Sequence, residues 1–192
     1  METHTRDALV SAAAKLLDGG GPAAVTLRAV GAAAGVSHNA PYKHFSNKEE
    51  MLAAVATREL YRQTTSLAEL GQSRAKPSEL LRKKMRGYVR WAIAHPERFR
   101  LTFGRWDQGT DELAATAATA NANLVALVAK AQGAGELPSG EPERMAALLL
   151  SVAHGAADRA LGGHLSAKGK GRADPEDLVD DLFRYLRRAA KP

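Results

Sequence analysis

Apolar residues recur along nearly the whole chain at the spacing i, i+3, i+4 and i+7, which places them on one face of an α-helix. No segment has the strict alternation of apolar and polar residues, or the clusters of β-branched residues, that indicate a β-strand. The pattern therefore predicts an all-α fold with about nine helices.

Capping residues mark the limits of the first helices. The first helix is expected to stop at the glycines 19–21, where a left-handed backbone is available. Side chains that accept hydrogen bonds from free backbone N–H groups mark the next three starts: Thr26, Ser37, and the S-x-x-E pair Ser46 and Glu49. The second helix is expected to reach Gly35. The third is very short, and the fourth runs over residues 47–70.

Proline and glycine divide the rest of the chain. Residues 71–77 are expected to connect two regions of different composition. A fifth helix ends near His95, because Pro96 cannot continue it but suits the first position of a sixth helix. Three longer helices follow: residues 111–132, residues 143–161, and a ninth helix capped by Asp174 ahead of Pro175.

Composition narrows the class of protein. The 192 residues carry a formal charge of +6 and a pI near 9.7, which favours an anionic partner such as nucleic acid. The absence of cysteine excludes disulfides and thiolate sites and suits a reducing compartment. The apolar runs are short and residues 1–6 are polar, so we expect no membrane span and no secretory signal. A cytoplasmic location follows as an expectation.

Residues 26–50 have the order of a helix-turn-helix: a capped helix of about two turns, then Ala-Gly-Val, then a second short helix. Gly35 supplies a backbone conformation that other residues resist, and Val36 fills the angle between the helices. The second helix of such a pair enters the major groove of DNA, and here it offers His38, Asn39 and Lys43. The alternative is an ordinary helical corner.

At these residues the sequence resembles the TetR family of bacterial transcription regulators. The resemblance rests on T-L-R-A-V-x-x-x-A-G-V-S, A-P-Y-K-H-F and S-N-K-E-E-M-L within residues 5–60. A shorter match, YVRWAIAHPERFRLTF over residues 88–103, is similar to the start of a WHG-type C-terminal domain. Two departures stand out: Gly31 where alanine is usual, and Pro41 where a helix-compatible apolar residue is more common. Pro41 is expected to distort the recognition helix near Ser37, whose carbonyl would lose its partner.

The resemblance implies a domain plan and a set of DNA contacts. Residues 1–48 would form the DNA-binding domain, the helix 47–70 would connect, and residues 77–192 would form a ligand-binding and dimerisation domain. The contacts it implies are phosphate contacts by Tyr42, His44 and Lys48, backbone or base-edge contacts by Thr26, Arg28 and Ser37, base readout by His38 and Asn39, and either role for Lys43. Phe45 would anchor the helix. Tyr42 as a buried packing residue and His44 as a plain surface residue remain alternatives.

One helix-turn-helix reads too few base pairs for useful specificity, so a homodimer on a palindromic operator is expected. The last two helices are candidates for its interface, through the small residues 153–157 and a stripe of Leu178, Leu182, Phe183 and Leu186. The alternative is that these helices close the core of one protomer.

The middle of the chain concentrates large side chains in a sequence otherwise poor in aromatics, which suggests a chamber for the small-molecule inducer that the resemblance implies. The candidate lining residues are Met85, Tyr88, Trp91, Phe99, Phe103 and Trp106, with His95, Asn121, Asn123 and His154 as polar groups that could orient a ligand. Both sets are also compatible with an ordinary core.

Other chemistry has little support. The six histidines include no pair at i, i+3 or i+4, and no nucleophile–base arrangement stands out, so neither a metal site, a cofactor nor an enzyme is expected. The rival hypothesis is a helical ligand-binding or small catalytic protein with a degenerate helix-turn-helix.

The basic excess does not lie in the helix-turn-helix region. Residues 1–60 hold equal numbers of basic and acidic side chains, whereas residues 72–106 hold ten basic and two acidic side chains. That segment is a solvated face, a flank that attracts DNA, or the rim of a pocket for an anionic inducer.

Overall fold

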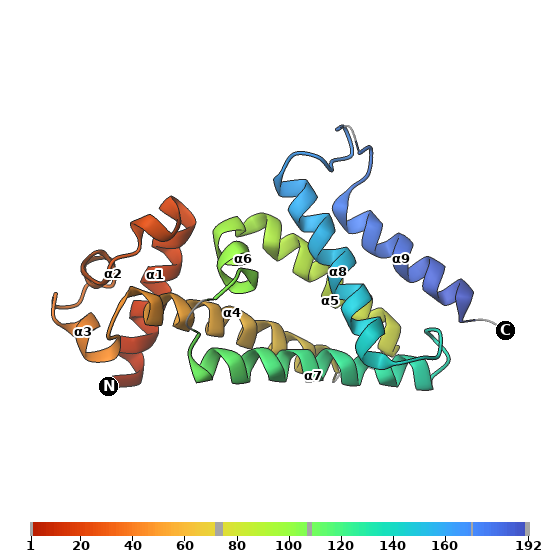
Figure 1. Cartoon of the computed structure of the whole chain (residues 1–192), viewed down its shortest axis with the longest axis horizontal. Helices are drawn as coiled ribbons and strands as arrows, with labels where there is room; N and C mark the ends of the chain where they lie inside the picture. The colour runs from red at the N-terminus through yellow and green to blue at the C-terminus, as the bar shows by residue number, and fades with distance from the viewer. Residues whose placement is uncertain (1, 72–74, 107–108, 170, 191–192) are drawn as a thin grey trace. The chain divides into compact units, whose positions relative to one another are not determined.

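The computed structural model describes residues 2–71, 75–106, 109–169 and 171–190, and within these residues it contains nine α-helices and no strand (Figure 1). The all-α prediction is confirmed. The helices are α1 (Glu2–Ala24), α2 (Leu27–Ala33), α3 (Ala40–His44), α4 (Lys48–Gly71), α5 (Pro77–Ala94), α6 (Pro96–Phe103), α7 (Asp111–Gly133), α8 (Pro142–Leu161) and α9 (Pro175–Ala189).

Several predicted helix limits are confirmed. The helical backbone of α1 breaks at Gly20 and at Gly21, whose φ is 64°. Thr26 caps α2 by accepting a hydrogen bond from the Ala29 N–H at 3.1 Å. Pro96 stands in the first turn of α6. Asp174 caps α9 by accepting from the Glu176 N–H at 2.8 Å.

Two predicted caps are wrong by one to two residues. Helix α3 begins at Ala40, with Asn39 at the capping position, so Ser37 is not its cap. Helix α4 is capped by Asn47, whose Oδ1 accepts from the Glu50 N–H at 2.8 Å, while Glu50 itself accepts from the Ser46 N–H at 2.7 Å. Asn47 is therefore the cap in place of Ser46, since asparagine is as good an N-cap as serine, and Glu50 takes the role predicted for Glu49 but bonds the N–H of Ser46 and not that of Asn47.

The chain divides into two compact units. The first comprises residues 1–62 and 95–118, and the second comprises residues 63–94 and 119–192. This division differs from the predicted boundary between residues 48 and 77, because α6 and the start of α7 belong with the helix-turn-helix. Helices α4 and α7 each contribute to both units.

Each unit has its own packed helices. In the first unit α1 packs against α2, α3 and α6 around a core that includes Leu9, Leu17, Val30, Phe45 and Met51. In the second, α5 packs against α8 and α9, and α8 packs against α9. The core of the second unit includes the following buried side chains: Leu81, Val89, Leu149, Ala153, Ala156, Ala157, Val179 and Phe183.

Part of the predicted dimer face lies inside the protomer. Ala153, Ala157 and Phe183 are at most 1% exposed, so they serve the core of the second unit. Leu178, Leu182 and Leu186 of α9 are only half-buried.

Helix α7 is the one described helix that is long and apolar enough to cross a membrane, with a hydropathy of 1.2 over its best window. One such helix is weak evidence for a span. Only 22% of that window is buried inside the structure, and the buried side chains of α7 include Leu113, Leu124 and Val128.

Candidate nucleic-acid interface

The turn between α2 and α3 has helix-turn-helix geometry. Gly35 adopts φ 68°, and the N–H of Val36 donates to the carbonyl of Gly31 at 3.1 Å. A Cβ on Gly35 would meet no atom within 4 Å, so the turn requires glycine for its backbone conformation and not for space.

Helix α3 is short, and backbone hydrogen bonds and a buried side chain hold it in place. The carbonyl of Ser37 accepts from the Ala40 N–H at 2.9 Å, so the prediction that this carbonyl loses its partner is wrong. Pro41 lies in the first turn of α3, where a missing N–H costs no helical hydrogen bond. Phe45 is 1% exposed and anchors the end of the helix, as expected, with the guanidinium of Arg6 5.5 Å from its ring centroid.

The two departures from the family pattern, Gly31 and Pro41, are one structural feature. A Cβ on Gly31 would lie 2.9 Å from Cγ of Pro41, which is closer than real side chains pack. Both residues are buried where α2 meets α3. The glycine therefore provides the space that the proline ring occupies.

The predicted DNA-contacting side chains share one property: they point to solvent. Tyr42 is 59% exposed, so the alternative in which it packs in the core is wrong. The other exposed members are Thr26, Arg28, Ser37, His38, Asn39 and Lys43, while His44 and Lys48 are half-buried. Within the described part of the chain, the side chains of Arg28, His38, Asn39 and Lys43 make no hydrogen bond or ion pair. They are available to a partner. We call this set, with Tyr42, His44 and Lys48, the α2–α3 surface.

The N-terminus of α4 already has a hydrogen-bond acceptor and negative charges of its own. Asn47 already accepts the Glu50 N–H, and Glu49 and Glu50 place two negative charges in the first turn. A phosphate at this point would depend on the ammonium group of Lys48.

The predicted inducer-lining residues fall into both units. Met85, Tyr88, Trp91, Asn121 and His154 belong to the second unit, and His95, Phe99, Phe103 and Trp106 belong to the first. Neither unit by itself brings the predicted set together.

Within each unit these residues have different surroundings. The Tyr88 hydroxyl lies 2.8 Å from Nδ1 of His154, and burial raises the pKa of that hydroxyl. Met85 and Phe99 are core residues, at 1% and 3% exposed, whereas Asn121 is exposed on α7. His95 lies 3.5 Å from a carboxylate oxygen of Asp18.

The first unit contains a cavity of about 430 Å³. Trp106 was a predicted ligand residue, but the other lining residues were not: Leu60, Thr102, Gly109, Thr110, Asp111, Leu113, Ala114 and Ala117. These residues come from three separate segments and form no periodic pattern or motif, so the sequence alone could not predict that they line a cavity.

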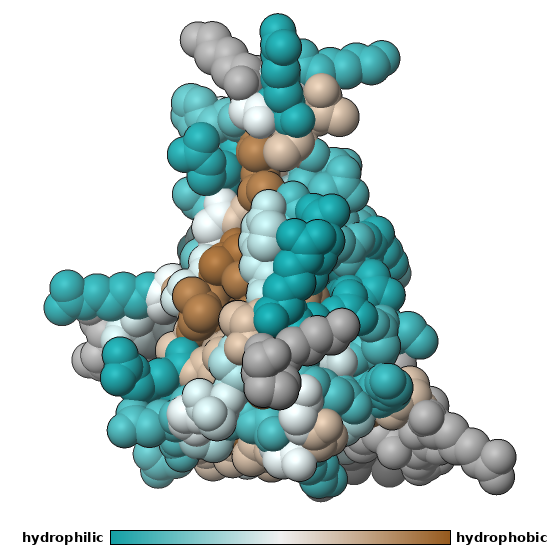
Figure 2. Space-filling model, turned by 90° about the vertical axis from the view of Figure 1, so that its right-hand side faces the viewer, coloured by the Kyte–Doolittle hydropathy of each residue, from teal (hydrophilic) through white to brown (hydrophobic). Residues whose placement is uncertain are grey.

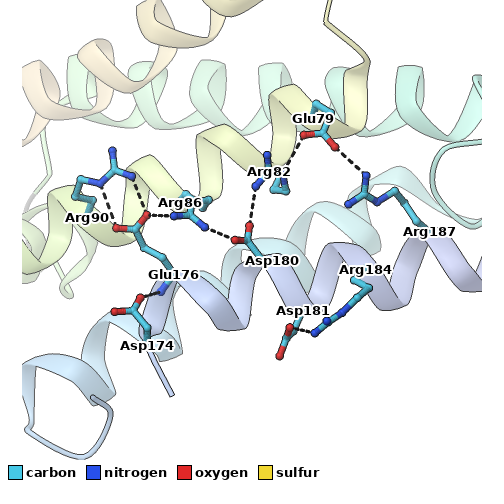
Figure 3. Close-up of polar contacts among 10 residues, drawn as sticks. All are labelled: Glu79, Arg82, Arg86, Arg90, Asp174, Glu176, Asp180, Asp181, Arg184 and Arg187. Carbon is cyan, nitrogen blue, oxygen red and sulfur yellow. Dashed lines mark hydrogen bonds and ion pairs between the residues drawn. The ribbon is translucent and has the colours of Figure 1, made fainter. Parts of the chain in front are cut away.

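The basic segment 72–106 is only partly a solvated face. Arg82, Arg86 and Arg90 on α5 form ion pairs with Asp180 and Glu176 on α9 (Figure 3). The hydrogen bond from Arg90 lowers the pKa of the Glu176 carboxyl. In the first unit, Arg98 pairs with Asp18 and lies 3.4 Å from Glu59. Much of the basic excess therefore holds helices together.

An all-helical chain with an exposed, polar α2–α3 surface has the architecture of a helix-turn-helix DNA-binding protein. Residues 9–55 match the family model of "Bacterial regulatory proteins, tetR family", and residues 81–186, more than half of the chain, match "Tetracyclin repressor-like, C-terminal domain". The chain belongs to the TetR family and is a DNA-binding transcription regulator. The narrower WHG-type assignment stays a prediction. No curated protein sequence matches the chain significantly.

Solved structures with the same fold include a Rhodococcus sp. RHA1 protein of unknown function, with a TM-score of 0.82 and 27% identity over 96% of this chain and 94% of that one. SmeT, the repressor of the Stenotrophomonas maltophilia multidrug efflux pump SmeDEF, has a TM-score of 0.66 and 25% identity over 94% and 88%. AibR, solved with isovaleryl coenzyme A and operator DNA, has a TM-score of 0.68 and 18% identity over 95% and 98%.

Proposed function

We propose that this protein is a cytoplasmic, non-enzymatic repressor that binds a palindromic operator as a homodimer and is released by a small molecule. The observation that carries the proposal is the α2–α3 surface, where Arg28, His38, Asn39 and Lys43 are exposed and make no hydrogen bond or ion pair within the described chain. The repressor function of SmeT and the operator-bound and acyl-CoA-bound state of AibR support the same assignment.

The exposed positions divide by chemistry into contacts that position the protein and contacts that read bases. The Tyr42 hydroxyl, the His44 imidazole and the Lys48 ammonium group would bind phosphate oxygens. The Asn39 amide can pair bidentately with adenine, and His38 can donate to guanine. Thr26, Arg28 and Ser37 would contact the DNA backbone or the neighbouring base edge. Lys43 could bind a phosphate or read a base.

The homodimer would form through α8 and α9. Leu148 of α8 is 44% exposed and Tyr185 of α9 is 58% exposed. Leu178, Leu182 and Leu186 of α9 are half-buried. Figure 2 looks from the side where α8 and α9 lie and shows a strip of apolar side chains between hydrophilic ones. An apolar strip of this kind on a helix pair favours a four-helix bundle between two copies.

Light scattering at micromolar concentration tests the dimer. We expect the mass of two chains for the native protein and a shift to one chain for Leu148→Glu. The control is Ile93→Glu, which places the same charge at a 38% exposed apolar residue of α5. A monomeric native protein would contradict the interface.

A gel shift with the DNA that flanks its own gene, across a salt series, tests the regulator function. We expect a specific complex whose affinity falls as salt rises, because cationic side chains displace counterions from phosphates. Failure to form a specific complex, or affinity that does not respond to salt, would favour the rival ligand-binding or catalytic protein.

A further inference from the structure

The cavity of the first unit lies among α4, α6 and the start of α7. Its walls are largely apolar: Leu60 comes from α4, and Leu113, Ala114 and Ala117 come from α7. Its volume of about 430 Å³ falls in the range of small-molecule sites, about 300–1,000 Å³. Size and lining both suit a small ligand.

Two polar atoms in the residues around this cavity have no partner. Oγ1 of Thr102 and Nε1 of Trp106 are both buried, and neither makes a hydrogen bond in the described structure. A buried hydroxyl or indole N–H is nearly always satisfied, because leaving it unpaired costs about 1–3 kcal/mol. Both residues line the cavity, so a ligand that carries a hydrogen-bond acceptor would satisfy them.

Charge restricts the ligand further. The one ionisable side chain among the described lining residues is the carboxylate of Asp111, and no arginine, lysine or histidine lines the cavity. An anionic ligand would meet a like charge and no counter-charge, which disfavours it. The cavity therefore selects neutral molecules over acids.

The helices that line the cavity also hold α1. Leu60 directly follows Glu59 on α4, and Thr102 lies one turn beyond Arg98 on α6. Arg98 pairs with Glu59 and with Asp18 of α1, so one side chain joins three helices of the unit that carries the α2–α3 surface. A ligand that moves α4 against α6 acts directly on this joint.

We propose that this cavity is the effector site, that it binds a non-anionic, mainly apolar molecule with a hydrogen-bond acceptor held by Thr102 and Trp106, and that the ion pairs of Arg98 transmit its occupancy to the α2–α3 surface. The proposal rests on the proposed function for its regulatory meaning, but the binding site stands on its own geometry. By linkage, a ligand that weakens operator binding is itself bound less tightly when operator is present.

Calorimetric titration with 2-naphthol and its anionic counterpart 2-naphthoate tests the site. We expect 2-naphthol to bind at least ten times more tightly than 2-naphthoate. Thr102→Val and Trp106→Phe should each weaken 2-naphthol about fivefold or more, the effect of one lost hydrogen bond of about 1 kcal/mol. The control is Thr116→Val on α7, which makes the same change at a threonine that does not line the cavity and whose hydroxyl donates to the carbonyl of Glu112, and it should leave the affinity unchanged.

Thermal unfolding of the unliganded variants checks that each variant is folded. Thr102→Val should melt at or above the temperature of the native protein, since it removes an unpaired buried hydroxyl. Preference for 2-naphthoate, or loss of affinity in Thr116→Val without loss in Thr102→Val, would overturn the site. Binding of 2-naphthol by a protein that forms no operator complex would leave the site standing and overturn the proposed function instead.

Discussion

The two compact units hold their helices together with the same chemistry at different depths. In the first unit Arg98, whose side chain is 11% exposed, joins Asp18 to Glu59, which is 2% exposed. In the second unit Arg82, Arg86 and Arg90 form a ladder with Glu176 and Asp180, whose side chains are 20% and 33% exposed (Figure 3). Arginine–carboxylate pairs occur in both units, but water hardly reaches the Arg98–Glu59 pair, whereas Asp18, at 29% exposed, is as open to water as the carboxylates of the ladder.

The burial of an ion pair determines how much it contributes to the free energy of unfolding. A buried pair that loses one member leaves an uncompensated charge out of water, which costs about 3–5 kcal/mol. An exposed pair is screened and contributes about 0–1 kcal/mol. The first unit therefore depends on Arg98, and its helices α1, α4 and α6 are expected to move as a set. The ladder joins α5 to α9 and is expected to contribute little stability.

Removal of Arg98 should have the largest effect. We expect Arg98→Ala to lower the free energy of unfolding by about 3 kcal/mol, since Arg58 and Arg62 remain 3.9 Å and 3.5 Å from Glu59 and supply part of the missing charge. Urea unfolding measures it. The matched control is Arg100→Ala, which removes a 60% exposed arginine from the same helix and should change stability by less than about 0.5 kcal/mol. Equal effects of the two would refute the importance of depth.

The contact of Gly31 with Pro41 gives the next largest effect. Gly31→Ala places a Cβ 2.9 Å from Cγ of Pro41, and overpacking of this kind costs about 2 kcal/mol. Gly31→Ala with Pro41→Ala should recover most of that loss. The same change in the second unit, Gly87→Ala on α5, meets no atom within 4 Å and should stabilise by about 0.5–1 kcal/mol. Thermal melts of the four proteins decide it, and a destabilised double variant would show that the two residues are independent.

The second unit also contains a buried lysine whose charged form burial disfavours. Lys84 donates to the carbonyl of Gln63 at 3.0 Å, and burial lowers its pKa from 10.5 to about 8. A shift of that size is a penalty of about 3 kcal/mol at pH 7, part of which the hydrogen bond to Gln63 offsets. We expect Lys84→Met to stabilise the protein by about 1–2 kcal/mol at pH 7.

The pH dependence of Lys84 has a definite sign. Between pH 8 and 10.5 the unfolded chain keeps the lysine proton that the folded chain has lost, so the free energy of unfolding of the native protein rises with pH relative to Lys84→Met. The gap between the two proteins should close across that window in urea titrations. A constant gap would show that the lysine titrates normally.

The ladder should give the smallest effect. A double-mutant cycle of Arg86→Ala and Asp180→Ala should yield a coupling of about 0.5 kcal/mol in dilute buffer, and less in 1 M salt. A coupling near 3 kcal/mol would show that the ion pairs of the second unit contribute as much to stability as the buried pair of the first.

Local signals explain what the sequence predicted correctly. Thr26, Pro96 and Asp174 mark helix limits through their own backbone chemistry, which needs no distant partner. The shift from Ser46 to Asn47 arises because two adjacent residues can each cap, and only the folded register chooses between them.

Contacts between distant segments explain what it missed. Arg82 and Asp180 are 98 positions apart, and no local pattern joins them. The cavity is likewise assembled from three segments, so Thr102 carries no mark of its own in the sequence. Gly31 and Pro41 did stand out separately, but their contact follows only from the way α2 meets α3.

The most direct test of the account is to measure how two exposed α2–α3 residues affect DNA preference. Binding of the native protein, Asn39→Ala and Tyr42→Phe to a pool of randomised operators would be compared by sequencing the bound fraction. We expect Tyr42→Phe to weaken binding to all sequences alike, because it removes a phosphate contact, and Asn39→Ala to change which sequence is preferred, because it removes a base contact. An unchanged sequence preference in Asn39→Ala, together with unchanged affinity in Tyr42→Phe, would contradict the assignment of this surface to DNA.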